Sequence, residues 1–220
     1  MKWLCTLFTP KDLIILAIPC LPTGRHETLK KKNKLMKAIL ATFLFLFQVA
    51  GSNLYSQPCL TAEERKLYDL IMAYRKTKKL PAVAVSAKLT QVAKTHVRDL
   101  MKNYKDNGKC NYHSWSEKGN WSPCCYTDDH AQAACMWNKP KEIAGYEGSG
   151  FEIAYWNSAG ANAKEALSGW QGSSGHNAVI VNSGIWQDMN WKAIGIGLDG
   201  EYGVVWFGAE EDSETAVSYN

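Results

Sequence analysis

The stretch AIGIGLDGEYGVVWFG, residues 193–208, decides the fold class. Two runs rich in β-branched and aromatic residues flank Asp199-Gly200, a dipeptide that favours a tight two-residue hairpin turn. Strands joined by such a turn run antiparallel, so the sheet is at least partly antiparallel. Helical patterns occur elsewhere in the chain but do not alternate with strands, which predicts an α+β domain built in layers.

Two helices are expected well before this hairpin. Residues 60–80, LTAEERKLYDLIMAYRKTKKL, place Thr61 and Glu64 at the spacing of a capping box, and apolar residues follow at helical spacing. Ser86 can cap a second helix, whose apolar face includes His96. We interpret His96 as a core histidine hydrogen-bonded to the backbone, because no second titratable group shares its face; a catalytic role is the alternative.

A third helix is expected over residues 161–170, ANAKEALSGW, and Gly172 with the serines after it ends this helix. His176 then follows Ser173-Ser174-Gly175 directly, where the backbone is least restricted. A Ser-His catalytic pair is disfavoured, because adjacent residues rarely align a hydroxyl with an imidazole and no acidic residue is in place to orient the ring.

The N-terminal part of the chain has the features of an export signal. Residues 36–56 place a charged start before the apolar run AILATFLFLFQVAG, which predicts a signal peptide cleaved near Gln57, with Ala50-Gly51-Ser52 as the alternative position. Residues 1–35 are then a leader, either an over-extended gene start or a disordered basic segment or signal anchor. The domain is expected over residues 57–210, and residues 211–220 form an acidic tail.

The charge of the chain depends on this division. The whole chain has a net charge of +4, but residues 1–56 hold eight Lys and Arg against two Asp and Glu. Residues 57–220 therefore hold 17 basic and 19 acidic side chains, a net charge of about −2. A nucleic acid is an unexpected partner for such a domain, because binding to phosphates depends on clustered Lys and Arg.

The cysteines also fit an exported protein. Two of the seven fall in the predicted leader, and the other five are Cys59, Cys110, Cys124, Cys125 and Cys135. Four of the five lie in a long loop that also holds Trp115, Trp121 and Trp137, so at least one disulfide is expected to close within residues 110–135. A zinc knuckle is the alternative, but no CxxC pair is present. The three tryptophans belong to the core or, as the lesser alternative, line a sugar or lipid surface.

Several motifs follow one another in a recognisable order. They are the first helix with Arg75 and Leu80-Pro81, the Leu89/Ala93/His96 helix, the His113 segment, Glu152 in GYEGSGFEIAYW, the Trp170 to His176 turn and the strand Ile194-Gly195-Ile196-Gly197. This order resembles the CAP superfamily (SCP/TAPS; cysteine-rich secretory, antigen 5 and pathogenesis-related 1 type) over about residues 60–208. The short spacing from Trp170 to His176 is similar to the compact bacterial branch. The resemblance implies a three-layer α-β-α sandwich with a mainly antiparallel sheet.

The resemblance also implies a cleft between the helical layers and the sheet, lined by two histidines and usually two acidic residues. His113 and His176 match the histidines and Glu152 matches one acid, although the family's Gly-Glu-Asn is displaced by one position here and lacks the Asn. The second acid has no clear counterpart, and Glu165 and Glu147 are weak candidates. His113, Glu152 and His176 could form an open zinc site, or a polar cluster that joins the loops.

The expected function follows from these features together. We expect a secreted or extracellular, monomeric binding module that does not span a membrane once processed; the periplasm or the cell surface are possible locations. The resemblance implies a lipid, cell-surface or protein ligand. A metal-dependent hydrolase or peptidase that uses the same cleft is the alternative, although a shared fold does not establish activity.

Overall fold

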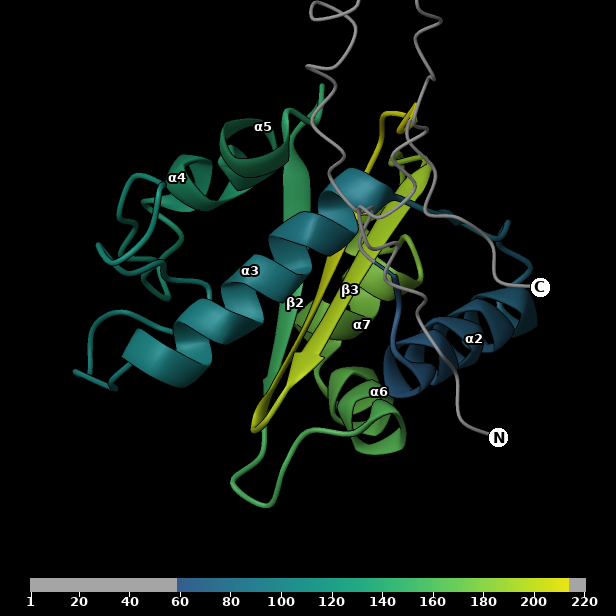
Figure 1. The fold of residues 1–220 in the computed structure, drawn as a ribbon. Helices are drawn as coiled ribbons and strands as arrows, with labels where there is room; N and C mark the ends of the chain where they lie inside the picture. The colour runs from purple at the N-terminus through teal and green to yellow at the C-terminus, as the bar shows by residue number, and fades with distance from the viewer. Residues whose placement is uncertain (1–58, 214–220) are drawn as a thin grey trace, which may run out of the picture. The chain divides into compact units, whose positions relative to one another are not determined.

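The computed structural model describes residues 59–213, in which helices lie on both faces of one sheet (Figure 1). The predicted leader, the signal peptide and most of the acidic tail lie outside the described residues. The strands are β1 (Ala84–Val85), β2 (Gly150–Trp156), β3 (Ala193–Asp199) and β4 (Tyr202–Gly208), in the spatial order β1-β3-β4-β2. β4 is antiparallel to both β2 and β3, and the short β1 is parallel to β3. The fold is therefore α+β with a mainly antiparallel sheet, as predicted.

The β3–β4 hairpin forms where the sequence predicts it. Asp199 pairs with Tyr202, and Gly200 between the strands has a φ of 54°, a value that glycine adopts at little cost. Side chains alternate along β4, so Val204 and Trp206 join one core while Val205 and Phe207 join the other. Both faces of the sheet are buried.

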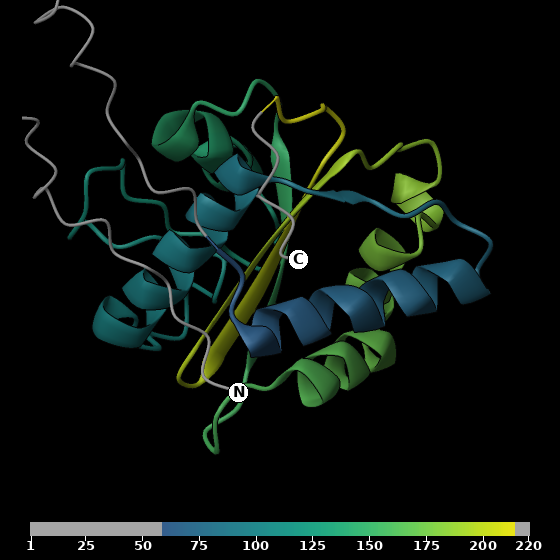
Figure 2. The same ribbon diagram turned by 45° about the vertical axis from the view of Figure 1, so that its right-hand side comes forward.

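The helices divide between these two faces. They are α2 (Ala62–Thr77), α3 (Ala87–Asn103), α4 (Ala133–Trp137), α5 (Lys139–Ala144), α6 (Ala163–Gly172) and α7 (Ser174–Ile180), with a 3-10 turn η1 (Gly184–Trp186). Figures 1 and 2 show α3, α4 and α5 on one side of the sheet and α2, α6 and α7 on the other. This arrangement is the predicted three-layer sandwich.

Two glycines of β3 bring α3 unusually close to the sheet. A Cβ atom built on Gly195 would lie 2.1 Å from the backbone carbonyl carbon of Leu89, and one built on Gly197 would lie 2.6 Å from that of Ala93. No side chain fits between these backbones, so the repeated glycine of AIGIG fixes the distance between the layer and the sheet.

The predicted helix starts are also confirmed. The side chain of Thr61 accepts a hydrogen bond from the backbone of Glu64, and the Glu64 carboxylate accepts one from the backbone of Thr61 in return. Ser86 caps α3 through the backbone N–H of Leu89. No helix within residues 59–213 is long and apolar enough to cross a membrane.

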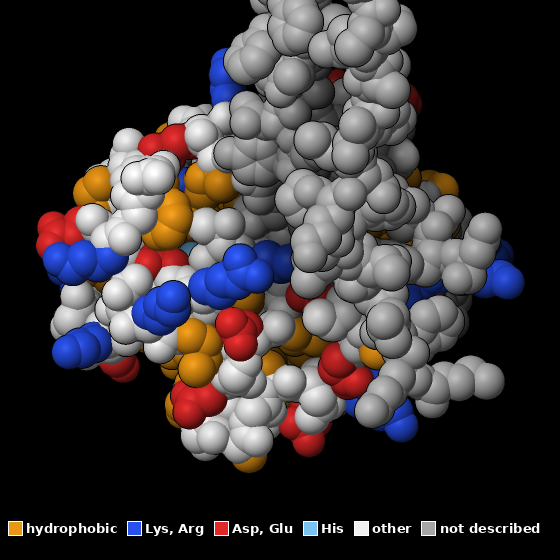
Figure 3. Space-filling model, viewed as in Figure 1, with side chains coloured by type: hydrophobic (Ala, Val, Ile, Leu, Met, Phe, Trp, Pro, Cys, Tyr) orange, Lys and Arg blue, Asp and Glu red, His pale blue; other side chains and the backbone are white. Residues whose placement is uncertain are grey.

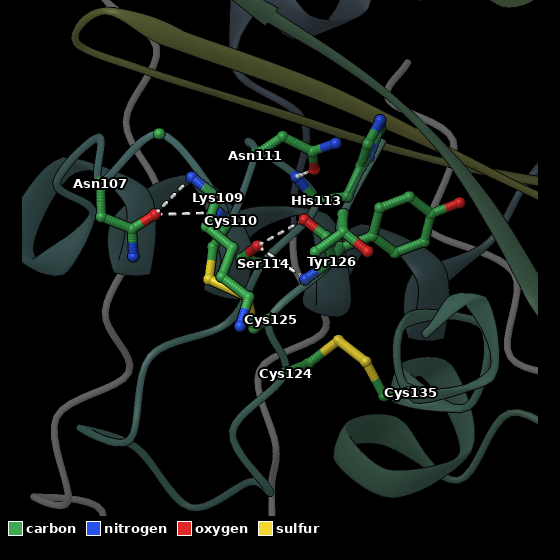
Figure 4. The surroundings of a disulfide bond; sticks show 12 residues. Asn107, Lys109, Cys110, Asn111, His113, Ser114, Cys124, Cys125, Tyr126 and Cys135 are labelled. Atoms are coloured by element: carbon green, nitrogen blue, oxygen red, sulfur yellow. Dashed lines mark hydrogen bonds between the residues drawn. A yellow bond between two sulfur atoms is a disulfide. The ribbon is translucent and has the colours of Figure 1, made fainter. Parts of the chain in front are cut away.

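The cysteine-rich loop is closed by two disulfides, Cys110–Cys125 and Cys124–Cys135 (Figure 4). The prediction of at least one bridge within residues 110–135 is confirmed. The zinc-knuckle alternative is wrong, because all four sulfurs are joined in pairs. The loop has some regular structure, since a single β-bridge joins Trp115 to Cys124 and α4 begins at Ala133.

Candidate functional site

A cavity of about 530 Å³ lies beside β2, the strand at one edge of the sheet. Its walls come from the cysteine-rich loop, α4, β2, α7 and η1, so residues from both faces of the sheet meet there. The lining residues are His113, Tyr126, His130, Ala133, Met136, Trp137, Phe151, Glu152, Ser173, Gly175, His176, Val179, Ile185 and Trp186. The three residues predicted for the site, His113, Glu152 and His176, are all among them.

Glu152 forms the floor of the polar end. Its side chain is fully buried, and its two oxygens accept hydrogen bonds from Nδ1 of His113 at 2.8 Å and Nδ1 of His96 at 2.5 Å. Burial raises the pKa of Glu152, but the charge of His96 and the hydrogen bonds from both imidazoles outweigh it, so the pKa lies below its usual value. Glu152 is therefore an ionised carboxylate with no free oxygen.

His96 is held between two acceptors. Its Nδ1 faces Glu152, and its Nε2 lies 3.0 Å from the carbonyl oxygen of Ser114. A carbonyl and an ionised carboxylate can only accept, so both ring nitrogens of His96 donate and the ring is an imidazolium. The ring also stacks on Trp115, with 4.1 Å between the ring centroids and 6° between the planes. The pair formed by His96 and Glu152 carries no net charge.

The prediction for His96 was right in one respect and incomplete in another. The side chain is fully buried and bonded to a backbone carbonyl, as expected of a core histidine. The comparison with residues on its own helix face does not reveal its partner, because Glu152 reaches it from β2. Sequence periodicity compares residues on one helix only, so a partner on a distant strand leaves no signal in it.

His113 comes from the cysteine-rich loop, with its ring against that of Tyr126 at a centroid distance of 5.2 Å (Figure 4). The backbone that carries the ring is held in place, because the backbone N–H of His113 donates to the side chain of Asn111. Nδ1 donates to Glu152, so a neutral His113 carries its lone pair on Nε2. The hydroxyl of Tyr126 in turn bonds Nδ1 of His130 at 2.9 Å.

His176 lies in the first turn of α7, with its ring centroid 6.4 Å from that of His113. Burial, together with the charge of His113, lowers the pKa of His176 to about 4, although the charge of Glu152 opposes the shift. At neutral pH it is an uncharged imidazole. The three site residues thus come from a loop (His113), a strand (Glu152) and a helix (His176).

The predicted zinc site, formed by His113, Glu152 and His176, stays a prediction. Within residues 59–213, no group of three or more His, Cys, Asp or Glu side chains is arranged to hold a metal ion. Both Glu152 oxygens are bonded to imidazoles, so the carboxylate fits the role of orienting His113 behind a metal rather than of binding the metal itself.

No second acid of the described chain completes the site. Glu165 lies at the surface, where it accepts a hydrogen bond from Asn157, and neither Glu165 nor Glu147 lines the cavity. Glu152 is the one carboxylate among the described lining residues. His96, the second imidazole bonded to Glu152, faces the carboxylate oxygen that another ligand of Glu152 would need.

The apolar walls are the part of the site that sequence reasoning missed. Phe151 packs edge-on against Trp137 and Trp186, with centroid distances of 5.5 and 4.9 Å. Ile185, beside Trp186, is 87% exposed. Of the loop tryptophans, Trp137 lines the cavity, whereas Trp115 is in the core. No local pattern marks Trp186, because η1 is a single turn without periodicity.

Solved structures of bacterial CAP-type proteins are similar to this chain. A cysteine-rich secretory protein from Staphylococcus aureus is 11% identical with a TM-score of 0.46, over 71% of this chain and 41% of its own. An outer surface protein from Borrelia burgdorferi is 19% identical with a TM-score of 0.48, over 69% and 96%. An extracellular protein with an SCP domain from Bacillus anthracis is 18% identical with a TM-score of 0.48, over 70% and 45%.

The chain thus spans less than half of the Staphylococcus and Bacillus chains that it matches. No curated protein matches it. The sequence model of the cysteine-rich secretory protein family matches residues 68–185, which is more than half of the chain. That range includes His96, His113, Glu152 and His176. The chain belongs to the CAP family of cysteine-rich secretory proteins.

Proposed function

We propose that this protein is an exported CAP-domain binding module that holds a small, mainly apolar ligand in the cavity beside β2. The export part of the proposal is supported by the two disulfides, which persist in oxidising compartments, and by neighbours described as extracellular or outer surface proteins. N-terminal sequencing of the exported protein tests it: a mature chain that begins near Gln57 is expected, and one that retains residues 30–34 would contradict export by the predicted signal peptide.

The observation that carries the binding function is the contrast between the two ends of the cavity. The walls are aromatic and aliphatic, which suits burial of an apolar ligand. At the polar end, Glu152 is already bonded to two imidazoles. The structure gives no hydrogen bond between Ser173 and His176, so a prepared nucleophile and base are not among the described contacts. A site of this kind favours binding over catalysis.

A solvatochromic dye tests this function directly. Nile red should bind saturably, with a blue-shifted emission, and Trp186→Ala should weaken the binding about tenfold or more because it removes one aromatic wall. Trp156→Ala is the matched control, because Trp156 is 42% exposed and does not line the cavity. Absence of saturable binding, or equal binding by both variants, would refute the proposal.

The proposal also covers the class of ligand, the oligomeric state and nucleic acids. The predicted lipid, cell-surface or protein ligand is compatible with the apolar cavity, and we propose a monomer, which sedimentation of the mature protein tests. On the face drawn in Figure 3, Lys and Arg side chains are interspersed with Asp and Glu. Such a mixed surface does not favour a nucleic acid partner.

A metal-dependent hydrolase is the second candidate, favoured by the hydrogen bond from His113 to Glu152. That bond leaves Nε2 of His113 for a metal, with His176 as the other imidazole ligand. Zinc held there would supply a Lewis acid for hydrolysis. Calorimetric titration with zinc at neutral pH tests the site: His113→Ala and His176→Ala should each abolish binding. If the unmodified protein takes up no zinc, this candidate fails.

A further inference from the structure

We propose that four aromatic rings at the hairpin end of the sheet form a second binding site, which takes a quaternary ammonium group. The rings, called here the hairpin-end cluster, are those of Tyr104, Tyr112, Trp156 and Tyr202. None of the four lines the cavity beside β2, so this site is independent of the binding function proposed above. The exposure of the cluster, the charges around it and its hydrogen bonds together indicate this class of ligand.

Four separate segments bring the cluster together. Trp156, the last residue of β2, pairs with Tyr202, the first residue of β4. Tyr104 directly follows α3, and Tyr112 comes from the cysteine-rich loop. The ring of Tyr112 lies against the other three, with centroid distances of 5.1, 5.8 and 6.3 Å to Tyr104, Tyr202 and Trp156. The rings therefore form one continuous aromatic surface.

This surface is open to solvent at Trp156. The residue is 42% exposed and is one of three exposed large apolar side chains within residues 59–213. A cation is attracted to the face of an aromatic ring, and most strongly to that of tryptophan. Three other rings of the described chain are covered by a Lys or Arg side chain, but no ring of the hairpin-end cluster is. These aromatic faces therefore remain for a cation from outside the described chain.

A carboxylate lies at the edge of the exposed ring. Glu201, in the β3–β4 turn, accepts a hydrogen bond from the indole N–H of Trp156 at 3.0 Å. No Lys or Arg within residues 59–213 forms an ion pair with Glu201. A cation over the indole thus meets both an aromatic face and an opposite charge.

Two more acids lie near the tyrosines. Burial, together with the charges of Asp106, the neighbouring tyrosines and Asp128, raises the pKa of Tyr104 to about 12. Burial also raises the pKa of Tyr112, and the charge of Asp106 acts in the same direction. The charges that act on these hydroxyls are negative. Such surroundings complement a cation and oppose an anion.

The hydrogen bonds of the cluster favour a quaternary over a primary ammonium. A primary ammonium carries three N–H donors, and each of them needs an acceptor. The hydroxyl of Tyr104 already donates to the carbonyl oxygen of Cys110 at 3.0 Å, and one oxygen of Glu201 is bonded to the indole. Aromatic faces make up most of the remaining surface. The methyl groups of a quaternary ammonium need no acceptor and suit such faces.

Four soluble probes test the ligand class. They are choline, its uncharged isostere 3,3-dimethyl-1-butanol, its primary analogue ethanolamine, and phosphocholine, which adds an anionic phosphate. NMR at constant ionic strength follows the indole N–H signals. Choline should shift the signal of Trp156 saturably and leave that of Trp186, in the cavity, unchanged. It should bind about tenfold more tightly than its isostere, and also more tightly than ethanolamine and phosphocholine.

Two variants locate the site. Trp156→Ala should abolish choline binding, measured by saturation transfer to the methyl protons of choline, while its Nile red binding stays unchanged. Glu201→Gln can still accept the indole hydrogen bond but lacks the charge, so choline should bind about threefold more weakly and the isostere equally well. Glu211→Gln is the matched control, because it removes the same charge beside Lys192, next to the opposite end of β3.

Each other result has a defined meaning. Equal binding of choline and its isostere would overturn the cation, and tighter binding of ethanolamine or phosphocholine would overturn the unphosphorylated quaternary class. No saturable shift of Trp156, or a shift of Trp186 in its place, would refute the site. The comparison of probes needs no variant, so it stands if Trp156→Ala fails to fold. Nile red reports on the cavity alone, so failure of the binding function and failure of this site are distinguishable.

Discussion

His96 supplies the charge that allows Glu152 to stay ionised inside the protein. A buried carboxylate is costly unless it is paired and hydrogen-bonded, and here one imidazolium provides both the charge and a short hydrogen bond. The second nitrogen of His96 ties the pair to the backbone of Ser114, next to His113. His96 therefore fixes the position of Glu152, and Glu152 in turn fixes the ring of His113.

Removal of His96 should be costly for this reason. His96→Leu leaves the charge of Glu152 buried without its counter-ion, so the free energy of unfolding should fall by about 3 kcal/mol. Thr90→Val is the matched control on the same helix, because the Thr90 hydroxyl is buried and bonds nothing within residues 59–213. That change should stay within about 1 kcal/mol of the unmodified protein. Urea unfolding compares them, and equal losses would contradict the assigned role.

His176 should make stability depend on pH. Its pKa is about 4 in the folded protein against 6.5 ordinarily, so as the pH falls below 6.5 the unfolded chain takes up a proton that the folded chain does not. Stability should therefore fall between about pH 6.5 and pH 4. His176→Asn should make this loss of stability smaller by about 2 kcal/mol. The value is below the full free energy of the pKa shift because the ring is partly exposed. Urea unfolding at both pH values, with chelator, measures it; parallel pH profiles would refute the assignment.

The sequence predicts which residues line the site but not how they are bonded to one another. His113, Glu152 and His176 stand out because their segments match a family order, and all three do line one cavity. The role of His96 could not be predicted, because its partner Glu152 is 56 residues away. The hydrogen bonds of His96 and His113 depend on which oxygens their rings face, and a sequence does not contain that information.

At the level of elements, the contact of α3 with β3 sets the geometry of the site. Glycines at positions 195 and 197 let the helix backbone touch the strand, which brings His96 on α3 within reach of Glu152 on β2. A larger spacing between the layers would break the ion pair even with every site residue in place. These glycines act on the site only through this spacing.

Gly195→Ala tests this contact. The added methyl would lie 2.1 Å from the Leu89 backbone, which cannot move as a side chain can, so the free energy of unfolding should fall by at least about 2 kcal/mol. Gly172→Ala in α6 is the control, because a Cβ there meets nothing within 4 Å. It should be neutral or slightly stabilising. Thermal unfolding distinguishes them, and a tolerated Gly195→Ala would show that the layers can separate freely.

Elements with a local capping or turn signal were predictable, and elements without one were not. The capping signals at Thr61 and Ser86 and the turn at Asp199-Gly200 are local, so the helices and the hairpin that they define appear in the structure. β1, α4 and α7 are stabilised by packing rather than by periodicity, and they were not expected. At α7 the sequence Ser-Gly-His suggests a turn, yet contact with α6 and η1 favours a helix.

At the scale of the whole molecule, the cavity depends on the disulfide that holds α4. Cys135 lies in α4 between Ala133 and Met136, which both line the cavity, and it is joined to Cys124 in the loop. The other bridge, Cys110–Cys125, closes the loop without including α4. One wall of the cavity is therefore attached covalently to the rest of the site.

Removal of each bridge should have different effects on binding. The pair Cys124→Ala/Cys135→Ala and the pair Cys110→Ala/Cys125→Ala should each lower stability by about 3 kcal/mol, as expected for loops of this length. Nile red affinity should fall more in the first pair, because α4 is released. Dye titration below the unfolding temperature of both variants measures this. Equal affinities would show that packing alone holds α4 in place.

The backbone contact between α3 and β3 also bears on how the protein opens. A helix that rests on side chains can lift away when a few rotamers change, but two backbones in direct contact leave no such partial route. The amides of α3 and β3 should then exchange with deuterium only when the whole domain unfolds, as one cooperative unit, and their protection should equal the global free energy of unfolding. Amides of η1, a single turn that carries the exposed Ile185, should exchange through local fluctuations long before. The amides that exchange most slowly would thus lie beneath the polar end of the cavity, and amides that exchange rapidly would lie at its apolar wall.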